Sequence, residues 1–249
     1  MMPQLLFSKG AIVLSALIIA IVLEQIFPAV LLRAKLQRWI KNFSLASLNF
    51  IVGPLIVVPI SAFAEGHAAV WRPDFLTGIL LDLLVLDLWI YFWHRANHRL
   101  PFLWRFHEVH HLDENLDATS ALRFHFGEVA LSSFVRAGLI FALAIPLRSV
   151  VVFETIVTVA AIFHHSNIKL PQRFEVIVSK LVVTPSIHFI HHHALRSDTD
   201  SNYATVLSLW DRLFRTCSKT QRSSDLKIGV EGMRDVPIVR LILRPFLKS

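Results

Sequence analysis

Long apolar runs separated by short polar or basic segments dominate the chain. Five of them stand out, over residues 11–32, 43–64, 75–93, 126–145 and 150–163. A helix needs roughly 20 apolar residues to cross a bilayer. The last run is shorter, so the hairpin that it forms with the fourth run is expected to cross only in part. The pattern predicts an all-α integral membrane protein with about four transmembrane helices or hairpins, followed by an amphipathic or interfacial helix over residues 174–183.

Basic residues directly after the first run decide how that run is interpreted. Segment 33–41 contains four Lys or Arg residues, a flank that indicates a retained transmembrane helix rather than a cleaved signal peptide. Lys and Arg concentrate in cytoplasmic loops, so this segment is expected on the cytoplasmic side. Counting the crossings from there, with a polar loop over residues 65–74 outside, returns residues 94–111 and 164–193 to the cytoplasmic side.

Composition supports a membrane protein and excludes several other classes. Hydrophobic residues make up 54% of the 249 residues and charged residues only 17%, with a mean hydropathy of +0.56. The net charge of +7 does not indicate a nucleic-acid partner, because the basic residues cluster beside the apolar runs. Cys217 is the single cysteine, which excludes an intramolecular disulfide and a Cys-based zinc or iron–sulfur site within one chain.

Histidine is unusually frequent, at 13 residues, and most of these residues fall in short boxes. The boxes are HRANH (94–98), HEVHH (107–111), HH (164–165) and HFIHH (188–192). Residues three or four apart share one face of a helix, and neutral imidazole is the commonest metal-ligand side chain. Because every box follows an apolar run on the same expected side, we predict a cytoplasmic helical cap that holds two metal ions.

The scarcity of carboxylates around the boxes limits which metal-dependent reactions the predicted site could support. Imidazole suits iron, zinc, copper and nickel, but soluble helical di-iron sites also use several Glu ligands, and here only Glu108 and Glu128 are near. An all-nitrogen site at a membrane surface favours oxygen activation on a lipid over metal-assisted hydrolysis. Charged residues inside the apolar runs are further candidates. We expect Asp87 to accept a hydrogen bond from a ligand's other ring nitrogen, and Arg136 and Glu154 to form a structural ion pair across the hairpin.

Six stretches within residues 87–216 carry a family resemblance. They are DLWIYFWHRANH, WRFHEVHH, RFHFGE, FHHSN, TPSIHFIHH and NYATVLSLWDRLFRT. Their order and content resemble the fatty acid hydroxylase/sterol desaturase superfamily of membrane di-iron proteins. The resemblance implies two non-haem iron ions held by His94, His98, His107, His110, His111, His165, His188, His191 and His192. It adds His125, Asn202 and Asp211 as further site candidates.

The chain departs from the family pattern at three points. Some members have one more histidine at the position of Ala161, so one iron is expected to have an open or water-filled position, or to be completed by His164 or His125. The family often has glycine where this chain has Ala204 and Arg215. No length is available for an appended cytochrome b5 domain, so we expect a separate electron donor, whether ferredoxin-like, cytochrome b5-like or a small reductant.

Together these features predict N-terminal transmembrane helices (residues 1–74), a catalytic domain (75–216) and a cytoplasmic C-terminal tail (217–249). The predicted activity is oxygen-dependent hydroxylation or desaturation of a lipid C–H bond in a fatty acyl, sterol-like or ether lipid, where hydroxylation could also lead to ether cleavage. The short tails favour a bacterial inner membrane.

The alternative function is that of a histidine-rich membrane protein that binds or transports metal without oxygenase activity. A transporter predicts polar ligands distributed through the depth of the helices, whereas these histidines gather at one end.

Overall fold

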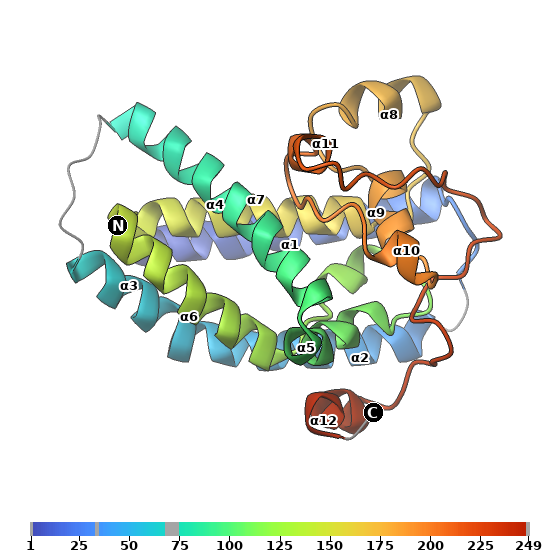
Figure 1. Cartoon of the computed structure of the whole chain (residues 1–249), viewed down its shortest axis with the longest axis horizontal. Helices are drawn as coiled ribbons and strands as arrows, with labels where there is room; N and C mark the ends of the chain where they lie inside the picture. Colours follow the sequence, from blue (N-terminus) through green and yellow to red (C-terminus); the bar gives the residue numbers. More distant parts are fainter. Residues whose placement is uncertain (1, 33–34, 68–74, 248–249) are drawn as a thin grey trace.

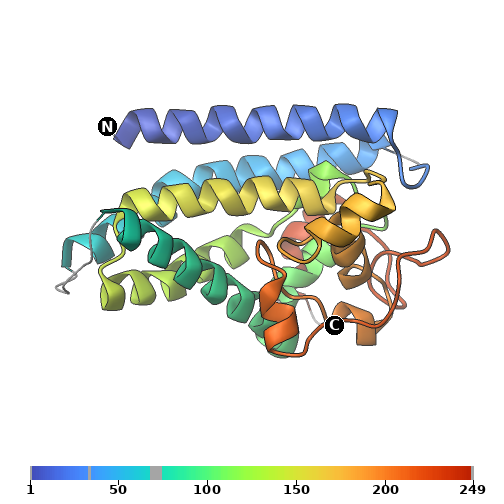
Figure 2. The ribbon, with the colours of Figure 1, turned by 90° about the horizontal axis from the view of Figure 1, so that it is seen from above.

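Helices account for the regular structure of the chain. The computed structural model describes residues 2–32, 35–67 and 75–247, and within these ranges it contains isolated β-bridges but no strand. The long helical elements are α1 (Met2–Ile26), α2 (Lys35–Val52), α3 (Val58–His67), α4 (Phe75–Arg99), α6 (Phe126–Leu143) and α7 (Leu147–His165). Helices α1, α2 and α7 run along the long axis of the molecule, with α1 outermost and next to α7, and α4 and α6 cross it obliquely (Figures 1 and 2).

Short elements gather at one end of the long helices and form a cap, on the right in Figure 1. They are α5 (Pro101–His111), η2 (Ala118–Leu122), α8 (Gln172–Val178), α9 (Pro185–His191), α10 (Arg196–Thr199) and α11 (Leu209–Leu213). The tail then forms α12 (Ile238–Leu243) and η3 (Arg244–Phe246), which lie against α2 and α5. The C-terminal ends of α4 and α7 reach this cap.

Five helical segments are long and apolar enough to cross a membrane, namely Gln4–Ile26, Leu36–Ala64, Leu76–Arg99, Phe126–Leu143 and Leu147–His165. Large apolar side chains point outward from them, as Phe7 (80% exposed) and Phe50 (81%) illustrate. Such surfaces are rare on soluble monomers and are expected where a bilayer is the solvent. The structure therefore supports a helical membrane protein, and the segment expected to be short, α7, has the length of a crossing helix.

Several predicted boundaries shift for identifiable reasons. The first helix ends at Ile26 instead of residue 32, because the chain after it pairs with the chain after α7: Ala29 N–H donates to the Asn167 carbonyl at 2.8 Å. The helix expected over 174–183 ends at Val178, since Val183 N–H donates to the carbonyl of Val206 at 3.0 Å. A π-helical turn, η1 (Gly53–Val57), joins α2 to α3 at Pro54. Arg33 and most of the polar loop 65–74 lie outside the described residues.

Candidate metal centre

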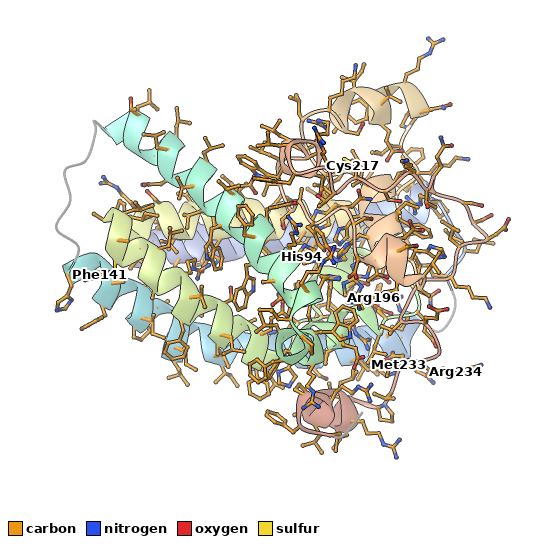
Figure 3. All side chains as sticks on the ribbon, viewed as in Figure 1. His94, Phe141, Arg196, Cys217, Met233 and Arg234 are labelled. Carbon is orange, nitrogen blue, oxygen red and sulfur yellow. The ribbon has the colours of Figure 1, made fainter. Side chains whose placement is uncertain are left out.

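Five histidine rings converge to form the first of two groups in the cap. Their ligand nitrogens lie within 4.8 Å of one another, and the rings come from α4, α5 and α9. Figure 3 shows His94, a member of this group, where α4 approaches the C-terminal elements. The members are His94, His98, His107, His111 and His191.

A second group contains His110, His165, His188 and His192, again with ligand nitrogens within 4.8 Å of one another. The Nε2 atoms of His110 and His165 are 3.0 Å apart, as are those of His165 and His188. Two imidazole nitrogens bound at right angles to one ion, at roughly 2.1 Å, would lie about 3.0 Å apart. The spacing of this group therefore fits a single ion at its centre.

Each HxxHH box is divided between the two groups. On α5, His107 and His111 belong to the first group, and His110 belongs to the second. At α9 the arrangement is reversed, since His188 and His192 belong to the second group and His191 belongs to the first. The i and i+4 rings of a box share one group because they lie one helical turn apart, and the i+3 ring faces the other. The boxes therefore interlock the two groups, whereas the sequence predicted that each box would face one way.

Backbone carbonyls fix which nitrogen is available to a metal in four of these rings. The Nδ1 atoms of His94 and His191 lie 2.8 and 2.7 Å from the carbonyls of Tyr203 and Ser201. In the second group, Nδ1 of His110 faces the Arg123 carbonyl at 3.2 Å and Nδ1 of His165 faces the Ala161 carbonyl at 2.8 Å. A carbonyl can only accept, so each Nδ1 carries the proton and each Nε2 keeps its lone pair.

The Glu128 carboxylate, instead of a backbone carbonyl, accepts the Nδ1 proton of His107. Its Oε1 atom lies 2.8 Å from His107 Nδ1 and also accepts a hydrogen bond from Asn97 at 3.0 Å. The opposite nitrogen of His107, Nε2, is buried and has no hydrogen-bond partner among the described residues. A carboxylate behind a histidine raises its basicity and fixes its orientation, as is common around metals. The sequence offered one signal for this role, because Glu128 lies in the RFHFGE stretch at the start of α6.

Unpartnered ring nitrogens complete the fit to a metal. Both nitrogens of His98 and of His111, and Nε2 of His191, are buried without a hydrogen-bond partner in the described part of the chain. Burial, reinforced by the neighbouring rings, lowers the pKa well below its ordinary value in His110, His111, His188, His191 and His192. These rings are therefore neutral at pH 7, which is the form that binds metal.

Asp87 lies elsewhere than the sequence suggested. Its Oδ2 atom accepts hydrogen bonds from Trp210 Nε1 at 2.8 Å and from Leu207 N–H at 3.2 Å, and no described contact joins it to a ligand ring. The spacing along α4 places Asp87 and His94 on one face of the helix. Asp87 lies two turns before His94, however, and there it contacts the segment 207–210. It holds that segment against α4, and its expected contact with a ring is made by Glu128.

Asp211 and Asn202 support the segment that carries the carbonyl acceptors. Asp211 accepts hydrogen bonds from the N–H groups of Tyr203 (2.8 Å) and Ala204 (3.0 Å), and from the hydroxyl of Thr216 (2.7 Å). Asn202 adopts a left-handed φ of 50° and donates to the Ile187 carbonyl at 3.1 Å. Both residues therefore act on the histidines through the backbone of residues 201–204. Arg215, where the family often has glycine, adopts a left-handed φ of 56°.

The two remaining histidine candidates lie outside both groups. His125 caps α6: its Nδ1 accepts from Gly127 N–H at 2.9 Å, so its Nε2 carries the proton that bonds the Ile242 carbonyl at 2.9 Å. Both nitrogens are therefore occupied, and His125 is unsuited to be a ligand. His164 is buried with its ring centre 4.0 Å from that of His188. Ala161, where some members have a histidine, supplies only its carbonyl, which leaves the second group with four rings.

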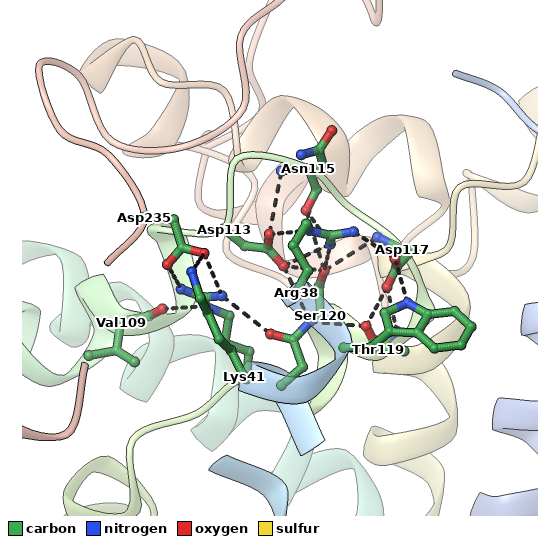
Figure 4. Close-up of polar contacts among 12 residues, drawn as sticks. Arg38, Lys41, Val109, Asp113, Asn115, Asp117, Thr119, Ser120 and Asp235 are labelled. Carbon is green, nitrogen blue, oxygen red and sulfur yellow. Dashed lines mark hydrogen bonds and ion pairs between the residues drawn. The ribbon is translucent and has the colours of Figure 1, made fainter. Parts of the chain in front are cut away.

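A buried polar network holds the cap against α2 (Figure 4). Arg38 donates to Asp113 at 2.6 Å and to Asp117 at 2.8 Å, and all three side chains are buried. Burial alone would raise the pKa of Asp113, but its bonds to Arg38 hold that pKa below the ordinary value. Next to it, Asp235 of the tail pairs with Arg123 and with Lys41. The network fixes residues 113–123, whose Arg123 carbonyl orients His110.

An apolar cavity of about 260 Å³ leads away from the histidines between α4, α6 and α7. Its walls include His94, His110 and His165 at one end. Arg136 and Glu154 lie along it, and they form the expected ion pair at 2.6 Å. Lys9 of α1 bonds the other oxygen of Glu154, also at 2.6 Å. Trp93 also lines this cavity. Most of its lining is apolar, as a site for a hydrocarbon chain requires.

Comparisons with known proteins cover the part of the chain that carries both histidine groups. The sequence model of a family described as fatty acid hydroxylase matches residues 79–216. Similar proteins include ornithine lipid hydroxylase OlsE of Rhizobium tropici, 25% identical over 79% of this chain and 59% of the relative. Alkylglycerol monooxygenase of Danio rerio is 32% identical over 55% of this chain and 29% of the relative. Cholesterol 25-hydroxylase of Rattus norvegicus is 26% identical over 64% of this chain and 53% of the relative. The chain thus spans less than two thirds of each of these relatives. No solved structure matches it.

Proposed function

The chain belongs to the fatty acid hydroxylase family, and on that basis we propose that it is a membrane-bound, oxygen-dependent di-iron enzyme that hydroxylates a lipid C–H bond. Family membership makes it an oxidoreductase of a lipid oxygenase family. The observation that carries the proposal is the pair of histidine groups at the end of an apolar cavity. Hydroxylation is preferred over desaturation because the similar proteins are hydroxylases and monooxygenases.

Nine histidines would hold the two irons. The first would be bound by His94, His98, His107, His111 and His191, and the second by His110, His165, His188 and His192. With electrons and protons from a separate donor, the irons would supply the activation of dioxygen, of which one atom enters the C–H bond and the other leaves as water. Glu128 and the backbone carbonyls keep the protons on Nδ1, so the Nε2 lone pairs stay directed at the metals.

The cavity residues would position the lipid and exclude water from the reacting carbon. The apolar walls between α6 and α7 bind the chain, and the rings of His94, His110 and His165 border its inner end. We infer that the cap faces the cytoplasm, because Arg38 and Lys41 lie on the cap side. A bacterial inner membrane suits this arrangement.

Metal and product analysis tests the proposal. Protein purified gently from iron-replete cells should contain about two irons per chain, and with dioxygen and a reductant it should add one oxygen atom to a membrane lipid, as mass spectrometry would detect. Loss of two hydrogen atoms from the lipid would favour desaturation instead. Protein without iron and without an oxidised lipid would support the alternative of a metal-binding or metal-transport protein.

A further inference from the structure

The ion pair between Arg136 and Glu154 has an unusual position. Both residues line the cavity, and both lie well inside membrane-crossing helices. With Lys9 the cluster contains two positive charges and one negative charge. Charged groups at this depth are costly and are commonly functional. The pair therefore carries an excess positive charge and borders the cavity.

Arg136 also retains an unused donor. One terminal nitrogen bonds Glu154 at 2.6 Å, whereas Nε is buried and has no hydrogen-bond partner among the described residues. The side chain is 8% exposed, so water outside the protein does not reach most of it. A buried donor without an acceptor is unfavourable in an apolar environment, and an oxygen atom of a bound molecule would satisfy it.

We propose that Arg136 anchors an oxygen atom of the lipid substrate, and that Glu154 and Lys9 hold its guanidinium in place. The inference rests on the proposed function, because it treats the cavity as the substrate site. The ligand class is a long-chain lipid with a hydroxyl, carbonyl or carboxylate oxygen at the end remote from the irons. Arg136 is thus a specificity-determining residue, and it selects both the kind of lipid and the carbon that reaches the histidines.

The length of α7 between Glu154 and His165 sets the distance between the oxygen anchor and the oxidised carbon. Glu154 and His165 lie eleven residues apart on α7, which corresponds to about 16 Å along the helix axis. An extended chain covers that distance in roughly 14 bonds, since three backbone bonds advance about 3.3–3.6 Å. The oxygen anchor and the oxidised carbon would therefore be separated by roughly that number of bonds.

Competition binding in detergent tests the anchor without requiring turnover. Tritiated hexadecan-1-ol is displaced from the full-length protein by unlabelled hexadecan-1-ol, hexadecanoate or hexadecane. The two oxygen-bearing probes should compete roughly tenfold better than hexadecane, which is the difference expected for a hydrogen bond to a charged group. Arg136→Met should remove this preference while still binding hexadecane. Arg148→Met removes the same charge from an exposed position at the start of α7, outside the cavity, and should keep the preference.

The outcomes separate this inference from the proposed function. Equal competition by all three probes in the natural protein, or an unchanged preference in Arg136→Met, would overturn the anchor even if the protein contains iron and oxidises lipid. A preference that depends on Arg136 in a protein without iron or product would retain the anchor and overturn the di-iron proposal. If Arg136→Met does not fold, Glu154→Gln is tested in its place. It removes the carboxylate that holds the guanidinium, so the preference should weaken, and an unchanged preference would overturn the arrangement proposed for Arg136.

Discussion

His110 and His191 occupy the same i+3 position of two HxxHH boxes, and each belongs to the group opposite to that of the other two rings in its box. Removing one ring from either box should therefore affect one metal position more than the other. We expect about one iron per chain in His110→Ala and in His191→Ala, against about two in the unchanged protein. Metal analysis with Mössbauer spectroscopy of iron-57 protein would show a different remaining site in each variant.

The double variant provides the control for that experiment. His110→Ala with His191→Ala should retain almost no iron, since both groups then lack a ring. His193→Ala changes a neighbouring histidine that pairs with Asp198 at 2.8 Å and lies outside both groups, so its iron content should stay near two. Identical remaining spectra in the two single variants would contradict the division of the boxes.

Glu128 should govern the behaviour of His107 without being a ligand itself. In Glu128→Ala, the Nδ1 proton of His107 loses its acceptor, so the ring can rotate or change tautomer. Loss of such a contact behind a metal ligand typically lowers metal affinity or activity 10- to 100-fold. Iron titration and lipid hydroxylation would measure both effects. Glu108→Ala is the matched control on α5, because Glu108 bonds Arg244 at 2.6 Å. An equal loss of iron in both variants would contradict the role of Glu128.

The sequence predicted which histidine rings converge but not how they divide between the two groups. The box spacing and the family resemblance together predicted the nine rings that converge, because i, i+3 and i+4 positions are determined by helix geometry. Which group each ring joins depends on how α5 and α9 face each other, and that is a tertiary contact without a local signal. The carbonyls of Ser201 and Tyr203 were unpredictable for the same reason, since every residue has a carbonyl.

Two site candidates show the limit of arguments from helical periodicity. Asp87 shares a helix face with His94, yet the partner it meets comes from residues 207–210, far along the chain. His125 belongs to a family motif, but both of its nitrogens are used in capping α6 and in holding the tail. By contrast, the pair of Arg136 and Glu154 was predictable, because a hairpin with a short turn places residues at equal distances from the turn side by side.

Asp211 should stabilise the site through the backbone. Asp211→Asn would place an amide where the carboxylate now accepts two N–H groups and one hydroxyl. A buried group left without its partner costs about 1–3 kcal/mol, so the melting temperature should fall and His94 should lose its fixed acceptor at Tyr203. Thermal unfolding with and without iron would measure the change. Asp225→Asn, at an exposed position of the tail, should leave both values unchanged.

Acid should destabilise the metal-free protein through the buried histidines. Burial lowers their pKa in the folded state, whereas unfolded histidines have a pKa of about 6.5. The unfolded state therefore binds more protons below about pH 6.5, and stability that is complete above this value is lost as the pH falls. The free energy of unfolding, obtained from thermal unfolding, should be lower at pH 5.5 than at pH 7.5. The difference should be several kcal/mol in total, at about 1.4 kcal/mol for each histidine. Equal melting temperatures would contradict neutral buried rings, since the Asp113 carboxyl titrates only at lower pH.

Arg38 should be the most sensitive residue in the network beneath the cap. Arg38→Met leaves Asp113 and Asp117 buried without their cation, and breaking a buried ion pair from one side costs about 3–5 kcal/mol. The cost should appear as a lower melting temperature and as weaker iron binding at the second group, because residues 113–123 carry the Arg123 carbonyl that orients His110. Asp113→Asn combined with Arg38→Met should recover part of the loss by removing one uncompensated charge. Arg240→Met, on the exposed face of α12, provides the charge-matched control. A variant that melts normally and binds two irons would show that the network is not needed to hold the cap.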